Sequence, residues 1–131
     1  MFVTDTHPLV WYVTAKHSFL SAKAVRAFKK AEAGEALMHV PSIVLLETAM
    51  LNAIGKVRLG ESFERWAERL SASSAFSVVD LEIKSISLAV GYGFNNDIFD
   101  KAIVATAVSM DLPLITKDTA ISESGLVEIY W

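Results

Sequence analysis

Short apolar runs alternate with longer amphipathic segments along the whole chain. Alternation of this kind is the pattern of a parallel sheet wrapped by helices. Five runs are short, continuous and partly β-branched, as strands buried on both faces should be: Phe2–Thr4, Leu37–Val40, Phe76–Val79, Leu114–Thr116 and Val127–Tyr130. We therefore predict an α/β fold with a short parallel sheet of about five strands, flanked by helices on both faces (α/β/α).

Six helices are expected between these strands. We place them at a start near His7, at 21–33, at 42–55, around 63–70, around 83–90 and at 98–110. Three carry apolar stripes: Ile43, Leu46, Met50 and Ile54; Phe63, Trp66, Ala67 and Leu70; Ile83, Ile86 and Val90. The last helix, Ile98–Met110, is apolar nearly all round, and we expect it to pack closely against the sheet.

Composition narrows the class of protein. The 131 residues suit a single domain over 1–131, and the 53% hydrophobic content suggests a buried partner interface beside a generous core. The longest uncharged stretch, 85–96, is shorter than the roughly 18 residues of a membrane span, so no membrane association is expected. An acid at position 5 does not suit a secretory leader.

Cysteine is absent, which excludes disulfides, a thiolate nucleophile and a cysteine-type zinc site, and fits a cytoplasmic location. The formal charge of −3 argues against a protein that coats nucleic acid by bulk charge. It leaves a nuclease open, because clustered acids at a metal site lower the net charge while basic residues elsewhere bind phosphate.

Four carboxylates stand where an α/β sheet could gather them. Asp5 and Asp118 each follow an apolar run, so both are expected at carboxyl ends of strands, the edge where open α/β sheets build their sites. Glu47 interrupts an apolar helical segment, and Asp100 lies in the acidic opening of another. Like charges brought together repel, and a divalent cation makes such a cluster tolerable. These residues predict a small metal-dependent enzyme.

Each acid also has a plainer interpretation. Asp5 could cap a helix, Asp97 and Asp100 could favour a helix macrodipole, and Asp118 could be a turn residue. Glu47 could face solvent or pair with an arginine, although a carboxylate within an apolar segment risks costly desolvation. Each signal alone is weak, and the joint pattern carries the prediction.

Several neighbours are accessory candidates. Asp97 is a second acid beside Asp100, Thr6 is a hydroxyl beside Asp5, and the Thr116 hydroxyl could orient a ligand or a water. Lys101 follows Asp100 directly and could position a phosphate, although most basic residues are expected on solvated helix faces. Four aromatic residues are expected in the core rather than as base-stacking platforms: Trp11, Tyr12, Phe19 and Phe28.

Four segments in register resemble the PIN domain, and specifically the VapC-type toxins of toxin–antitoxin pairs. They are 3–11 (VTDTHPLVW), 42–48 (SIVLLET), 97–107 (DIFDKAIVATA) and 114–118 (LITKD). The resemblance implies a Rossmann-like fold, a metal-dependent ribonuclease, an obligate protein antitoxin and a homodimer. By position, the family's acidic quartet falls on Asp5, Glu47, Asp100 and Asp118.

Further implications follow from that resemblance. Asp97 matches an additional acid found in many members, and Thr116 the hydroxyl residue before the last acid. Lys101 stands where arginine is frequent and Pro8 where a small residue is, so the quartet stays intact and only substrate affinity is affected. We also hypothesise that an apolar surface with Trp11, Tyr12 and Phe28 receives the antitoxin.

The expected reaction is hydrolysis of RNA phosphodiesters at one or two Mg²⁺ or Mn²⁺ ions, because all-oxygen ligands suit hard cations. Asp5, Asp100 and Asp118 would hold the metal, with Glu47 as a further ligand or a water-orienting base. Two alternatives remain. One is a catalytically silent PIN-like binding module. The other is a phosphoacceptor receiver domain, which the lone Asp5 and the lack of a lysine beyond Lys117 disfavour.

Overall fold

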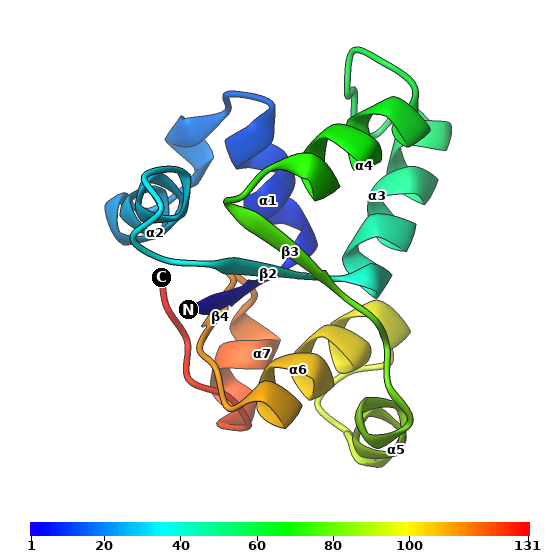
Figure 1. Ribbon diagram of the computed structural model, residues 1–131. Coiled ribbons are helices and arrows are strands. Elements are labelled where there is room, and N and C mark those ends of the chain that lie inside the picture. The colour runs from blue at the N-terminus through cyan, green and yellow to red at the C-terminus, as the bar shows by residue number, and fades with distance from the viewer.

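The computed structural model describes residues 1–131 as a four-stranded parallel sheet between two layers of helices. The strands are β1 (Phe2–Thr4), β2 (Met38–Pro41), β3 (Phe76–Val79) and β4 (Leu114–Ile115). The helices are α1 (Thr6–Val13), η1 (His17–Phe19), α2 (Ala22–Glu32), α3 (Ser42–Ala53), α4 (Phe63–Ala72), α5 (Ile83–Gly91), α6 (Ile98–Met110) and α7 (Thr119–Ser124). Figure 1 shows α1 to α4 on one side of the sheet and α5 to α7 on the other. The predicted α/β/α architecture is confirmed.

The sheet has the order β3-β2-β1-β4, with every neighbouring pair parallel. Val3 is in register with His39 on one side and with Leu114 on the other. The chain therefore builds outward from β1 through β2 to β3, then returns past β1 to add β4. This return makes the boundary between β1 and β4 the point where the strand order reverses.

The predicted count of about five strands is too high by one. The run expected as a fifth strand, 127–130, forms a single parallel bridge between Ile129 and Leu114. Backbone bonds from Leu114 N to Glu128 O (2.8 Å) and from Tyr130 N to Leu114 O (2.9 Å) hold it there. Since β4 has only two residues, it offers too short an edge for a longer ladder. The helices η1 and α7 were not predicted, because neither is long enough to show a repeating helical pattern of apolar residues.

The core lies where α6 meets the sheet. Residues 102 to 107 of α6 are all buried, which confirms that this helix packs closely on every side. Phe28 of α2 is fully buried against the opposite face, and Tyr12 is 7% exposed with its ring stacked on Phe28. These two residues are core, as expected, so the hypothesis that they form a surface for an antitoxin is wrong.

Two of the predicted apolar stripes face outward instead of inward. On α3 the buried residues are Val44 and Thr48, while Leu46, Met50 and Ile54 are exposed. On α5 the exposed fractions of Ile83 and Val90 exceed 80%. The stripe on α4 behaves differently, because Trp66 and Leu70 enter the core. No helix combines the length and the apolar character needed to span a membrane.

Candidate active site

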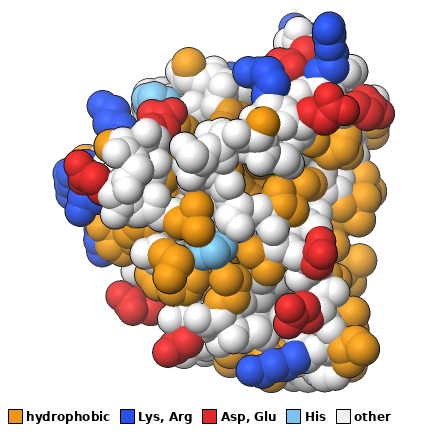
Figure 2. Space-filling model, viewed as in Figure 1, with side chains coloured by type: hydrophobic (Ala, Val, Ile, Leu, Met, Phe, Trp, Pro, Cys, Tyr) orange, Lys and Arg blue, Asp and Glu red, His pale blue; other side chains and the backbone are white.

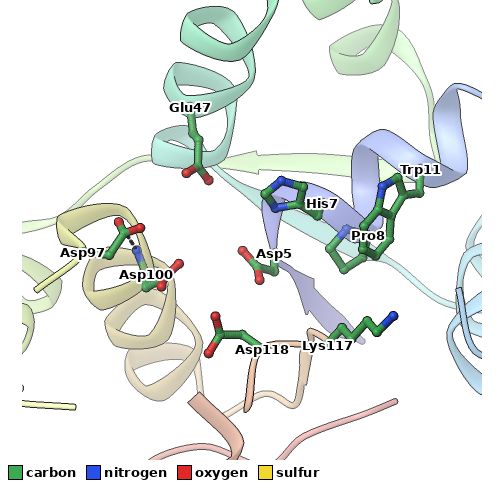
Figure 3. A pocket seen from close by; sticks show the side chains of 9 residues that line it. All are labelled: Asp5, His7, Pro8, Trp11, Glu47, Asp97, Asp100, Lys117 and Asp118. Atoms are coloured by element: carbon green, nitrogen blue, oxygen red, sulfur yellow. Dashed lines mark hydrogen bonds between the residues drawn. The ribbon is translucent and has the colours of Figure 1, made fainter. Parts of the chain in front are cut away.

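The carboxyl edge of the sheet gathers the predicted acids at the boundary between β1 and β4. Asp5 ends β1, Asp118 follows β4, Glu47 projects from α3 and Asp100 from the first turn of α6. Figure 3 shows these four side chains directed toward one space. They line a cavity of about 290 Å³. The complete lining is Asp5, His7, Pro8, Trp11, Glu47, Asp97, Asp100, Lys117 and Asp118.

Asp5 is fixed at the base of the cavity by two donors. Its Oδ1 accepts a hydrogen bond from Thr6 N (2.7 Å), and its Oδ2 accepts one from Thr116 Oγ1 (2.7 Å). Thr116 is fully buried, and its Oγ1 also accepts a bond from Asp118 N (3.1 Å). One hydroxyl therefore connects the acids that end β1 and β4. The structure places Thr116 as a positioning residue between them.

A second cluster of hydrogen bonds arranges the start of α6. Asn95 Nδ2 donates to Asp100 Oδ2 (2.8 Å), and Asn95 Oδ1 accepts from Asp97 N (3.0 Å). Asp97 in turn caps the helix, because its Oδ1 accepts from Phe99 N (2.9 Å) and Asp100 N (3.3 Å). Asp5 and Asp118 cap α1 and α7 in the same way. Capping and lining the cavity are thus compatible roles for one carboxylate.

Burial and mutual repulsion destabilise the ionised form of these acids and so raise their pKa values. Burial raises the pKa of Asp5, while its two hydrogen-bond donors and the nearby His7 lower it and the charge of Asp118 raises it. The pKa of Asp100 is raised to about 7, chiefly by burial and also by Asp5, Asp97 and Asp118. Burial likewise raises the pKa of Glu47, with added repulsion from Asp5 and Asp97. The cavity therefore holds more negative charge than its surroundings balance.

No ion pair compensates this charge, although His7 lies close enough to lower the pKa of Asp5 and of Glu47. The only ion pair of the structure joins Arg69 of α4 to Glu61, which precedes that helix, and neither residue lines the cavity. Lys117 lines the cavity, but Figure 3 shows its side chain directed away from the acids, toward Pro8 and Trp11. The Thr6 hydroxyl is buried without a partner at hydrogen-bond distance, although it lies near enough to Glu47 to lower the pKa of that carboxyl.

The donor set suits a hard divalent cation. Every acidic group here offers oxygen, as Mg²⁺ and Mn²⁺ prefer. As the side chains stand, no three acidic or histidine groups lie in an arrangement that could hold one ion. Asp100 Oδ1 and Asp118 Oδ2 accept no hydrogen bond, however, so each carboxylate keeps an oxygen free for ligation. Mutual repulsion between acids favours such a spread arrangement, and a cation would draw them together.

The structure sorts the predicted site residues into three groups. Asp5, Glu47, Asp97, Asp100 and Asp118 line the cavity together. Thr6 and Thr116 are buried behind them. Lys101 lies elsewhere and lines a separate apolar groove with Ile86, Val90 and Ile98.

Five lining or supporting residues were missed as site residues, namely Lys117, His7, Trp11, Pro8 and Asn95. Lys117 was the easiest to find, because it directly precedes an acid after a strand. Trp11 lies two turns into α1, and only the fold shows that it overhangs the cavity.

Comparisons with known proteins agree with this arrangement. The family model described as PIN domain matches residues 2–125. The fold is similar to the crystal structure of DNA-bound VapBC from Salmonella typhimurium, with a TM-score of 0.69, 18% identity and coverage of 98% of this chain and 95% of that one. A toxin–antitoxin complex from Klebsiella pneumoniae gives a TM-score of 0.68, 17% identity and coverage of 100% and 98%.

VapBC2 from Rickettsia felis, bound to a DNA fragment from its promoter, gives a TM-score of 0.67, 14% identity and coverage of 98% and 96%. The comparison with curated proteins finds no match. The structural likenesses extend the shared fold over the whole chain, and the family model covers every acid of the cavity. The chain therefore belongs to the PIN domain family.

Proposed function

We propose that this protein is a metal-dependent endoribonuclease and the toxin of a toxin–antitoxin pair. The observation that carries the proposal is the convergence of Asp5, Glu47, Asp100 and Asp118 in one cavity where none of them forms an ion pair. Membership of the PIN domain family supports a nuclease activity at this edge.

The residues divide the chemical work. Asp5, Asp100 and Asp118 would hold the metal, and the Thr116 hydroxyl orients the Asp5 carboxylate and binds the backbone N–H of Asp118. A divalent cation, Mg²⁺ or Mn²⁺, supplies an activated water and offsets the charge that develops on the phosphate. Glu47 has a raised pKa, which suits a group that orients the attacking water and takes its proton.

The toxin assignment rests on the solved structures that share this fold. The similar structures include VapBC complexes and a toxin–antitoxin complex, and each covers at least 95% of both chains. We infer from these likenesses that a cognate protein antitoxin binds this chain.

A homodimer is the second assembly that we propose. Seven of the ten exposed large hydrophobic side chains belong to α3, α5 and the start of α6, and we call them the apolar face: Leu46, Met50, Ile54, Ile83, Ile86, Val90 and Ile98. A groove lined by Ile43, Ile86, Val90 and Ile98 joins the three helices. Figure 2 shows hydrophobic side chains along the side of the molecule where α3 and α5 lie.

A patch of this kind is seldom left in water. Lys101 is the one charged side chain that lines its groove, so two copies can meet across a two-fold axis with few charges brought together. A second copy of the chain is therefore the occupant that we propose for the apolar face.

The test of the nuclease is cleavage of a panel of structured RNAs by antitoxin-free protein. Reactions with Mg²⁺, with Mn²⁺ and with chelator are compared, and Asp100→Asn is run beside the wild type. Asp111→Asn is the matched control, because it makes the same change at the opposite, exposed end of α6. We expect metal-dependent cutting that is lost only in Asp100→Asn. Equal cutting by both variants would refute the site, and no cutting by folded, metal-loaded protein would favour a silent binding module.

A further inference from the structure

The cavity has a second end that the acids do not form. Pro8 and Trp11 line it, and Figure 3 shows them on the side away from Asp100 and Glu47, with His7 between them and the acids. The Trp11 ring lies between two others. Its centroid is 5.7 Å from that of His7, and 5.5 Å from that of Phe19 with an interplanar angle of 28°. We call His7, Trp11 and Phe19 the aromatic shelf.

The shelf is open to solvent, contrary to the expectation that Trp11 and Phe19 are core residues. Phe19 is 52% exposed, His7 is exposed and Trp11 is half-buried. Leu20, the residue after Phe19, is buried and fixes the end of η1. An exposed phenylalanine that does not enter the core gains little stability from its ring, so its place beside a cavity suggests binding.

The turn that carries Phe19 is firmly held. Lys16 N donates to Trp11 O (2.7 Å), which closes the turn after α1. The His17 ring stacks on buried Tyr12 at 4.7 Å and 6°, and its Nε2 lies 3.1 Å from Tyr12 O. The shelf is therefore preorganised, and a planar ligand would not have to order it on binding.

The charge of the site explains why a flat neutral surface is useful there. A chain of net charge −3 with five acids in its cavity repels a polyanion until a metal is bound, and Lys117 is the one lysine or arginine that lines the cavity. Stacking of bases on aromatic rings adds affinity that does not depend on bulk charge. Stacking requires an unpaired base, as in loops and single strands of RNA.

We propose that the aromatic shelf stacks an unpaired nucleobase next to the phosphate that the acids address. Lys117, which points toward the same end of the cavity, contacts the phosphate of that nucleotide. This inference rests on the proposed ribonuclease function and deepens it. It assigns Trp11 and Phe19 to the binding of an unpaired nucleotide beside the cleavage site.

The experiment measures RNA binding apart from cleavage. Short single-stranded RNAs carry 2-aminopurine at successive positions, and Ca²⁺ replaces Mg²⁺ so that hydrolysis is slowed. Fluorescence reports stacking, and anisotropy reports affinity, for wild type, Phe19→Ala, Phe19→Trp and Trp11→Phe. Leu126→Ala is the control, because Leu126 is another exposed hydrophobic residue that does not line the cavity. A fully paired duplex of the same sequence tests the need for an unpaired base.

We expect Phe19→Ala to bind single strands about tenfold more weakly or worse, and to lose the fluorescence change. Phe19→Trp and Trp11→Phe should keep both signals, Leu126→Ala should match the wild type, and the duplex should bind poorly. In cleavage assays Phe19→Ala should raise KM with little change in kcat.

The outcomes separate the shelf from the nuclease itself. If the wild type cuts RNA but Phe19→Ala binds it as tightly and with the same fluorescence change, the shelf is refuted and the nuclease stands. If Phe19→Ala keeps RNA binding but loses a co-expressed antitoxin, the surface belongs to the protein partner and the proposal is overturned. If folded, metal-loaded wild type neither binds nor cuts any RNA, both proposals fail together.

Discussion

The acid cavity and the apolar face are built on the same helices and yet obey opposite rules. Helix α3 sends Glu47 into the cavity and its neighbour Leu46 onto the face. Helix α6 does the same with Asp100 and Ile98. In the cavity, most acidic groups are wholly or partly buried, while on the face apolar groups are exposed to solvent. The cavity thus carries an unfavourable burial of charge and the face an unfavourable exposure of apolar surface, and binding would relieve each.

The two regions differ in how visible they are in the sequence. An acid within an apolar segment is conspicuous, because burying a charge needs a reason. An apolar residue within an apolar helix is not, since helical spacing identifies a stripe but not what covers it. Periodicity therefore identifies the apolar face of a helix, but only the fold shows whether that face packs into the core or is left for a partner.

The strongest test of the cavity is Asp5→Asn. The change keeps the shape of a side chain that is 6% exposed, but removes the negative charge that a cation needs. Losing several kcal/mol of transition-state stabilisation corresponds to a cleavage rate on the order of 10³-fold lower or worse. The melting temperature should not fall, because the buried charge is gone. Single-turnover RNA cleavage and thermal unfolding measure the two effects, and Asp111→Asn should cut normally. An active Asp5→Asn enzyme would remove Asp5 from the chemistry.

The corresponding test of the apolar face is Val90→Glu. Val90 is 82% exposed, so the variant should fold with unchanged thermal stability as a monomer. In a two-fold dimer the change buries two unpaired charges, and the dissociation constant should rise on the order of 100-fold or more. Light scattering over a dilution series measures it. Leu126→Glu, a charge on an exposed hydrophobic residue outside the face, should leave the dimer intact. A wild type that stays monomeric at high concentration would contradict the interface.

Sequence reasoning reached the fold through the strands, whose continuous apolar runs leave few alternatives for a buried parallel sheet. It reached Asp5 and Asp118 through their place after two of those runs. It failed at 127–130, because strand propensity cannot show that β4 is too short to pair with it. It failed at Trp11 and Phe19 as well, because the exposure of an aromatic ring depends on how α1 and η1 pack.

Thr116→Val tests whether the Thr116 hydroxyl arranges the cavity for metal binding. Valine keeps the volume and removes the hydroxyl that donates to Asp5 and accepts from Asp118 N. Loss of such a supporting hydrogen bond typically costs roughly 10- to 100-fold in metal affinity or activity. We expect weaker Mn²⁺ binding and slower cleavage, with recovery in Thr116→Ser, which restores the hydroxyl. Titration of Mn²⁺ against cleavage rate measures the shift. A variant with unchanged Mn²⁺ dependence would show that the hydroxyl serves only the fold.

The smallest expected effect is a pH-dependent stabilisation by metal. The pKa of Asp100 is raised from 3.8 to about 7, so the folded protein holds its proton more tightly than the unfolded chain does. Its contribution to stability is therefore full below about pH 4 and is lost as pH rises through about 7. A cation that replaces the proton should restore this loss, so Mn²⁺ should raise the melting temperature by about 2–5 °C near pH 8 and by less near pH 5.

Thermal scans with Mn²⁺ and with chelator, at both pH values, measure this effect on wild type, Asp100→Asn and Asp111→Asn. The asparagine at position 100 carries no titratable proton, so Asp100→Asn should lose both the pH dependence that belongs to this site and most of the metal-induced shift. Asp111→Asn should keep both. An equal metal-induced shift at the two pH values, or a full shift in Asp100→Asn, would mean that the cation binds away from the cavity. The repulsion among its acids would then need another source of relief, and His7 and Lys117 are the basic side chains that line the cavity.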